Sequence, residues 1–147
     1  MDTQHQPEQP QMEPNIWIPS QSIAGLRLRK HADYQRAYAA SCKKQSASMS
    51  WFLAPQADSH AAPRVGLTAG KVLGKAHERN RIKRRMREAL RRHVKLLPQG
   101  CDLILHPRRS VLKLEFPKLE AEIVRVLTQA KADAVRDRSA TSNRART

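Results

Sequence analysis

The stretch from Gly74 to His93 reads GKAHERNRIKRRMREALRRH, where Lys and Arg dominate and only Glu78 and Glu88 oppose them. Like charges repel one another in a folded protein, so this concentration indicates a partner of opposite charge. Phosphate backbone is the natural partner, because each Lys or Arg placed on a phosphate releases a condensed cation. A salt-bridged solvated face would alternate in sign, as the sequence around Glu120 does. The stretch therefore predicts nucleic-acid binding, with a solvated basic face or a nuclear-localisation run as the alternatives.

The composition of the whole chain supports this interpretation. Its 147 residues carry 28 Lys and Arg against 13 Asp and Glu, a formal net charge of +15. No apolar run has the length of a membrane-spanning helix. The N-terminus, MDTQHQPEQP, has neither the basic start nor the apolar centre of a signal peptide. With two cysteines that form no C-x-x-C pair, the sequence predicts a cytoplasmic protein that does not bind membranes.

Catalytic chemistry by the protein itself is not expected. The six histidines include no pair at zinc-ligand spacing. A metal-dependent nuclease gathers several carboxylates, whereas here Asp33 and Asp102 are isolated in the sequence. No glycine-rich phosphate loop or nucleophile motif is present. We therefore expect no catalytic residue and no metal site in the protein.

Hydrophobic periodicity predicts the elements that position the basic stretch. The predicted order is a helix over 32–40, strands over 48–54 and 64–69, a helix from 76, a strand over 101–106 and a helix over 116–132. The two earlier strands are joined by a loop, which most simply makes them an antiparallel pair. On the basic helix, an apolar seam is predicted and cations cover the remaining surface; the seam residues are Ile82, Met86, Ala89, Leu90 and Val94. The prediction is a single small α+β domain with one mostly antiparallel sheet covered by helices.

The domain is predicted to span residues 26–132. Residues 1–25 are rich in Gln and Pro, contain no Lys or Arg, and are predicted to be a disordered extension. Within it only Ile16, Trp17 and Ile18 form an apolar spot, which could dock on the domain or on a partner. Residues 133–147 are predicted to be a disordered basic tail.

The segment RVGLTAGKVLGKAHERNRIKRRMREALRRH closely resembles the signature of the bacterial ribonuclease P protein component. The matching positions are Lys71, Gly74, Lys75, Ala76, Arg79, Asn80, Arg81, Lys83, Arg84 and Arg87. The likeness extends to LRLRKHADYQRAY, which is similar to the family's opening helix, and to GCDLILHPR, which is similar to the strand after the basic helix. It covers roughly residues 26–129. This chain departs from the pattern at Ser41, Val72 and His77.

The resemblance implies a division of labour between protein and RNA. An RNA subunit would remove the 5′ leader of precursor tRNA, with Mg²⁺ held mainly by RNA and no cofactor bound by the protein alone. The implied contacts to the RNA subunit are Lys71, Lys75, Arg79, Asn80, Arg81, Lys83, Arg84, Arg87 and Arg91. The implied contacts to the leader are Tyr34, Tyr38, Phe52 and Arg108, because aromatic rings stack on bases of any identity. The family also implies a left-handed crossover through the basic helix.

Three alternatives stay open at this point. A ribosomal protein or other structural RNA-binding protein fits the composition equally well. A DNA-binding regulator is less compatible, since recognition helices use Asn, Gln or Ser for base edges in place of near-continuous Arg. One tyrosine, Tyr38 more readily than Tyr34, could pack in the core and not stack on RNA.

Overall fold

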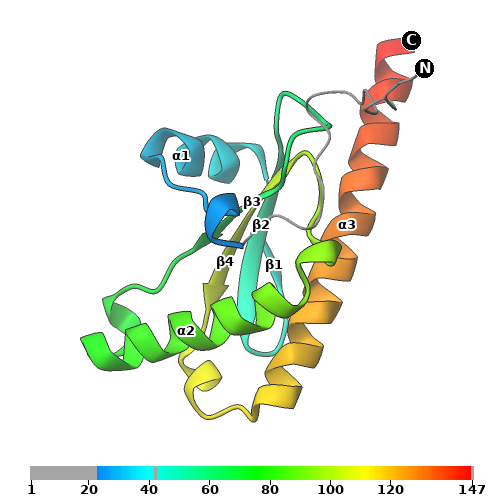
Figure 1. The fold of residues 1–147 in the computed structure, drawn as a ribbon. Helices are drawn as coiled ribbons and strands as arrows, with labels where there is room; N and C mark the ends of the chain where they lie inside the picture. Colours follow the sequence, from blue (N-terminus) through cyan, green and yellow to red (C-terminus); the bar gives the residue numbers. More distant parts are fainter. Residues whose placement is uncertain (1–22, 42, 147) are drawn as a thin grey trace, which may run out of the picture.

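The computed structural model describes residues 23–41 and 43–146. Within these residues, four strands and three α-helices form the domain, and short 3-10 helices connect them (Figure 1). The helices and strands are α1 (His31–Ala40), β1 (Lys43–Gln45), β2 (Met49–Pro55), β3 (Arg64–Leu67), α2 (Ala76–Arg92), β4 (Cys101–Pro107) and α3 (Phe116–Arg146). The 3-10 helices are η1 (Ile23–Leu26), η2 (Lys71–Leu73), η3 (Val94–Leu96) and η4 (Arg109–Leu112). The predicted α+β class is confirmed.

The strand order in the sheet is β1-β2-β4-β3. Strand β2 pairs antiparallel with β1 and β4, while β3 and β4 are parallel and are connected through α2. The predicted direct pairing of the strands over 48–54 and 64–69 is wrong, because β4 lies between them. Nearly every residue of β4 is buried, and a strand buried on both faces belongs in the centre of a sheet.

The main core lies between one sheet face and the pair α2 and α3. Leu103 and Leu105 of β4 point to this face and are fully buried. The predicted seam of α2 is confirmed for Ile82, Met86, Ala89 and Leu90, which are at most 1% exposed, whereas Val94 lies beyond the helix in η3 and is half-buried. Helix α3 runs beside the sheet (Figure 1) and contributes an apolar stripe to this core. Its buried residues are Leu119, Ile123, Val126, Leu127, Ala130 and Ala134. Because the apolar seam of α2 holds this helix on the sheet, the other faces of α2 are open to solvent.

The opposite face of the sheet carries a smaller cluster beneath α1. Leu28, Ala37, Ala54 and Ile104 are buried there. Side chains alternate between the faces of a strand, so Ile104 points to α1 while its neighbours in β4 point to the main core. Helix α1 has ten residues and covers only part of this face, which leaves room beside it for partly exposed side chains.

Helix α3 is longer than predicted. It continues as helix to Arg146, past the helical end expected at residue 132 and into the segment expected to be a disordered tail, whose last residue, 147, lies outside the described residues. Asp133 and Ala134 are still buried against the domain, which shows that packing continues beyond the predicted boundary. The N-terminal extension lies outside the described residues up to position 22, and its last residues, 23–25, belong to η1.

Candidate nucleic-acid interface

The start of α2 is fixed by a compact network around Gly74. The Glu78 carboxylate accepts the backbone N–H of Lys75 at 2.9 Å and is bound by Arg109 of η4 at 2.8 Å. Arg109 also donates to the carbonyl of Leu73 at 2.7 Å. The Arg109 guanidinium, followed by the Lys75 N–H, lowers the pKa of Glu78 to about 2. Gly74 has φ of 123°, and a Cβ there would lie 2.3 Å from atoms of both Arg109 and Glu78. Only glycine fits this position.

Some cations of α2 bind other groups of the same protein. Arg85 is half-buried and donates to the carbonyls of Val111 and Leu114, which holds η4 against the helix. Arg91 and Arg92 both pair with Glu88, at 2.6 and 3.0 Å. Arg85 therefore has a structural role, and Arg91, although exposed, already has a carboxylate partner.

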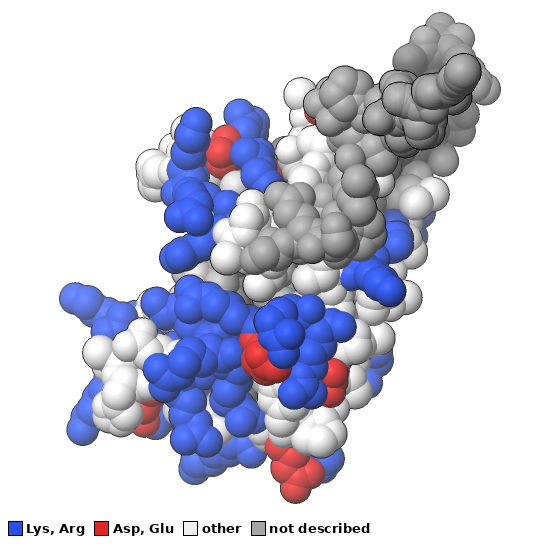
Figure 2. Space-filling model, viewed as in Figure 1, with Lys and Arg blue, Asp and Glu red and all other residues white. Residues whose placement is uncertain are grey.

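Four further cations of α2 have a different position. Arg81, Arg84 and Arg87 are exposed, and Lys83 is half-buried. No hydrogen bond or ion pair of these four side chains occurs within the described part of the chain. Together with Lys75 and Lys71 they form the cationic surface of α2, and Figure 2 shows Lys and Arg gathered over this helix. Such a surface is available to bind phosphates.

The remaining predicted contacts to the RNA subunit lie at the edge of this surface. Asn80 is exposed. Arg79 is half-buried, and its Nε donates to the carbonyl of Gly74 at 3.2 Å. His77, one departure from the family pattern, is exposed in the first turn of α2. The structure thus brings the predicted residues together on α2 and the turn before it.

A second surface is formed by aromatic side chains beneath and beside α1. The rings of Tyr34 and Tyr38 are 6.3 Å apart, and Tyr38 meets Phe52 of β2 edge to face at 4.9 Å. All three residues are half-buried. The structure therefore brings these three predicted leader contacts together, and we call Tyr34, Tyr38, Phe52 and His106 the aromatic cluster.

His106 belongs to this cluster although the sequence did not indicate it. Its Nε2 lies 2.9 Å from the hydroxyl of Tyr38, and its ring is 5.4 Å from that of Phe52. Burial, followed by the charge of Lys43, lowers the pKa of His106. Both causes favour the neutral imidazole, whose Nε2 donates to or accepts from the Tyr38 hydroxyl according to its tautomer. The alternation of side chains along β4 could have indicated which face of the sheet His106 occupies. Only the pairing of β2 with β4 shows that Phe52 lies beside it.

Tyr34 rests directly on the backbone of β3. A Cβ at Gly66 would lie 2.6 Å from the Tyr34 hydroxyl oxygen and 2.8 Å from two ring carbons. The hydroxyl donates to the carbonyl of Leu28 at 3.3 Å, and burial is the main cause that raises the pKa of Tyr34. The glycine is thus what lets the ring lie against the sheet.

Arg64 joins α1 to the sheet. It binds Asp102 of β4 with two parallel hydrogen bonds, of 2.7 and 2.8 Å, and Asp33 of α1 at 3.1 Å. Both carboxylates are buried. These are the two acids considered above as possible catalytic groups, and the structure uses them to position α1. Within the described residues, no three His, Cys, Asp or Glu side chains gather as a metal site.

Arg108, the fourth predicted leader contact, makes hydrogen bonds within the protein. Its guanidinium donates to the carbonyl of Ser46 at 2.8 Å and to Oε1 of Gln45 at 2.7 Å. It therefore fixes the turn between β1 and β2, and it is half-buried beside that turn.

Among the described helices, none is long and apolar enough to span a membrane.

These features define a class of protein: a small α+β nucleic-acid-binding domain with a cationic helix on one side of its sheet and an aromatic cluster on the other. The profile of the family described as "Ribonuclease P" matches residues 24–131. The chain belongs to this family. The resemblance seen in the sequence is thereby confirmed, and the ribosomal and DNA-binding alternatives are not supported.

The relatives carry one name. The ribonuclease P protein component of Chloroflexus aggregans is 37% identical over 105 residues, covering 71% of this chain and 76% of the relative. That of Brevibacillus brevis is 30% identical over 105 residues, covering 71% and 82%. That of Chlamydia trachomatis is 42% identical over 67 residues, which span 46% of this chain and about half, 54%, of the relative.

Solved structures agree with the fold. The RNase P protein of Staphylococcus aureus has a TM-score of 0.62 and 27% identity, covering 72% of this chain and 95% of that one. The RNase P protein from Thermotoga maritima has a TM-score of 0.62, covering 70% and 96%, and at 23% identity it supports the fold alone.

Proposed function

We propose that this chain is the protein subunit of a bacterial ribonuclease P, in which an RNA subunit removes the 5′ leader of precursor tRNA. The cationic surface of α2 binds the RNA subunit, and the aromatic cluster binds the single-stranded leader. The observation that carries the proposal is the placement of these two surfaces on opposite faces of one sheet. A rigid sheet can hold two RNAs at a fixed distance. The energy of binding both RNAs then orients the substrate relative to the RNA subunit.

The protein acts by electrostatics and positioning, and the chemistry belongs to the RNA. Catalyst and substrate are both polyanions, and a protein of net charge +15 reduces their repulsion. Mg²⁺, held mainly by RNA, supplies Lewis-acid chemistry at the scissile phosphate. On the protein side, the buried acids Asp33 and Asp102 both pair with Arg64. We place the assembly in the cytoplasm.

The test is leader release from a 5′-labelled precursor tRNA across a magnesium series, with protein alone, RNA subunit alone, and both. We expect no cleavage by protein alone and stimulation of the RNA subunit at moderate magnesium. The stimulation should shrink as magnesium rises, because divalent cations also screen the repulsion. Cleavage by nuclease-free protein alone, or no stimulation at any magnesium concentration by folded protein, would contradict the proposal.

The aromatic cluster gives a second prediction. Tyr38→Ala should weaken binding of precursor tRNA about 5-fold to 150-fold, since one base stack is worth about 1–3 kcal/mol. Tyr34→Ala should have a similar effect. Binding of mature tRNA, which has no leader, should stay unchanged. Affinities are measured by fluorescence anisotropy for both RNAs.

The control separates stacking from packing. Tyr38→Phe keeps the ring and removes only the hydroxyl that meets His106, so it should retain most of the affinity for precursor tRNA. If Tyr38→Ala lowered the affinities for both RNAs equally, together with the melting temperature, the ring would be a core residue and the leader assignment would fail.

A further inference from the structure

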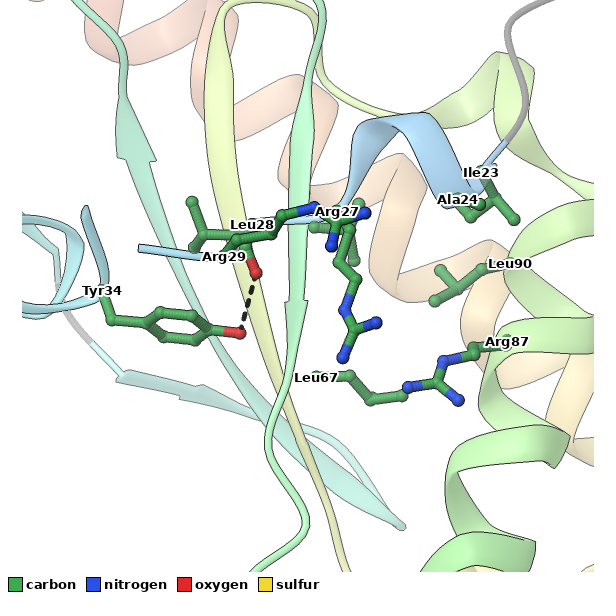
Figure 3. Close-up of a pocket in the computed structure, with 10 residues that line it drawn as sticks. Ile23, Ala24, Arg27, Leu28, Arg29, Tyr34, Leu67, Arg87 and Leu90 are labelled. Atoms are coloured by element: carbon green, nitrogen blue, oxygen red, sulfur yellow. Dashed lines mark hydrogen bonds between the residues drawn. The ribbon is translucent and has the colours of Figure 1, made fainter. Parts of the chain in front are cut away.

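A pocket of about 530 Å³ lies between η1, β3 and α2, and it borders both assigned surfaces, since Arg87 of the cationic surface and Tyr34 of the aromatic cluster line it. Its size falls in the range of sites that hold a small organic ligand. Figure 3 shows that Arg27 and Arg87 come from opposite sides of the pocket, the first from the segment before α1 and the second from α2. The pocket is therefore built by elements that are distant in the sequence.

The rim of the pocket is cationic. Arg27, Arg29 and Arg87 line it, and all three side chains are exposed. In the part of the chain that the structure describes, none of the three takes part in an ion pair or side-chain hydrogen bond. A planar guanidinium with open N–H groups matches the geometry of a phosphate. The rim can thus hold a phosphate group without breaking an internal contact.

The inner wall of the pocket is apolar. Leu67 of β3 and Leu90 of α2 line it together with the buried Val65. Such a wall accepts the flat face of a base but offers no hydrogen bonds to distinguish one base from another. An apolar wall below a cationic rim matches the two parts of a nucleotide, its base and its phosphate.

The pocket adjoins the aromatic cluster through Tyr34. This ring lines the pocket, with its hydroxyl bound to the carbonyl of Leu28 (Figure 3). It also neighbours Tyr38, at 6.3 Å between ring centroids. One RNA chain can therefore lie on the aromatic cluster and continue into the pocket.

We propose that this pocket holds one unpaired nucleotide, with its base against Leu67 and Leu90 and its phosphate between Arg27 and Arg87. The pocket then lies at the junction of the two RNA-binding surfaces. The proposal rests on the proposed function for the source of that nucleotide: it belongs either to the leader of precursor tRNA or to the RNA subunit.

The first experiment uses the full chain and adenosine 5′-monophosphate as the probe, followed by amide chemical shifts. We expect the amides of Leu67 and Leu90 to shift, and adenosine or inorganic phosphate alone to bind about 10-fold more weakly or not at all. Leu67→Phe fills the pocket and should abolish the shifts. Arg27→Ala should weaken binding about 10-fold without affecting folding, because the side chain is exposed. Lys30→Ala is the matched control, an exposed cation of the same segment that does not line the pocket.

The second experiment identifies the source. Arg27→Ala is titrated with precursor tRNA and, separately, with the RNA subunit, and a loss of about 10-fold is expected for one of them. A loss confined to precursor tRNA assigns the nucleotide to the leader, and a loss confined to the RNA subunit assigns it there.

The two proposals can fail separately. If the mononucleotide causes no shifts at the pocket and Arg27→Ala binds both RNAs like Lys30→Ala, the pocket proposal is overturned, whatever the cleavage assay shows. Mononucleotide binding needs no ribonuclease P RNA, so it would stand even if the protein failed to stimulate cleavage.

Discussion

Replacing Lys83, Arg84 and Arg87 by Glu should lower the affinity for the RNA subunit by roughly 10³-fold or more, because each charge-assisted hydrogen bond is worth about 1.5–3 kcal/mol. These side chains make no hydrogen bond or ion pair within the described residues that the substitutions would break. The fold should therefore persist, and the far-ultraviolet circular dichroism should not change.

Salt dependence provides the second measurement on the same variant. With about 6–10 phosphates bound, the wild-type affinity should fall about 10³-fold to 10⁵-fold between 50 and 200 mM salt. The slope of log K against log salt should decrease by about 3 in the triple variant, about one for each phosphate that the variant no longer binds. Affinities across a salt series, measured by filter binding, test both statements.

A matched control comes from α3. Lys118, Arg125 and Lys131 are exposed on that helix, and their replacement by Glu changes the net charge by the same amount. This variant should lose far less affinity than the α2 variant. Equal losses would mean that binding follows net charge alone, and the assignment of α2 as the main RNA-binding element would be wrong.

The largest effect on stability is expected from Arg64. Arg64→Ala leaves the buried carboxylates of Asp33 and Asp102 without their shared cation. Removal of one partner from a buried ion pair costs about 3–5 kcal/mol, which is a large part of the stability of a small domain. Denaturant unfolding should show this as a lower midpoint.

A double variant tests the cause of that loss. Arg64→Met combined with Asp102→Leu removes both charges of the strongest pair, and apolar replacements of buried pairs are often close to neutral. We expect the double variant to be more stable than Arg64→Ala. The stability lost by the double variant is compared with the losses of Arg64→Met and Asp102→Leu measured separately. If it equalled their sum, the network would act by packing and not by charge compensation.

Local patterns were sufficient to predict the helices and most strands. The spacing of Ile82, Met86 and Leu90 identified the buried seam of α2 because helical periodicity is a property of neighbouring residues. Strand β1 escaped prediction because its residues, Lys43–Gln45, are polar and exposed and show no apolar alternation. It forms only because β2 offers hydrogen bonds along its edge.

The candidate site was predicted in part. The cations of α2 were found from residue type and spacing, and the three aromatic residues were assigned to the leader by the family resemblance; the structure groups each set on one surface. The sequence did not show that Arg91 pairs with Glu88, that Arg85 binds η4, or that Arg108 holds the β1–β2 turn. These contacts form only in the folded protein. The sequence does not distinguish a charged side chain that binds another part of the protein from one that is free to bind RNA.

By itself the sequence determined the charge of this protein, the amphipathic character of its basic helix and the family to which it belongs, because all three depend on residue identity and local spacing. Only the tertiary structure decided that β4 separates β2 from β3, that His106 joins Tyr38, and that Arg27 faces Arg87 across a pocket. Each of these is an interaction between segments distant in the chain. Such interactions are set by how the faces of helices and strands pack together, and no single segment contains that information.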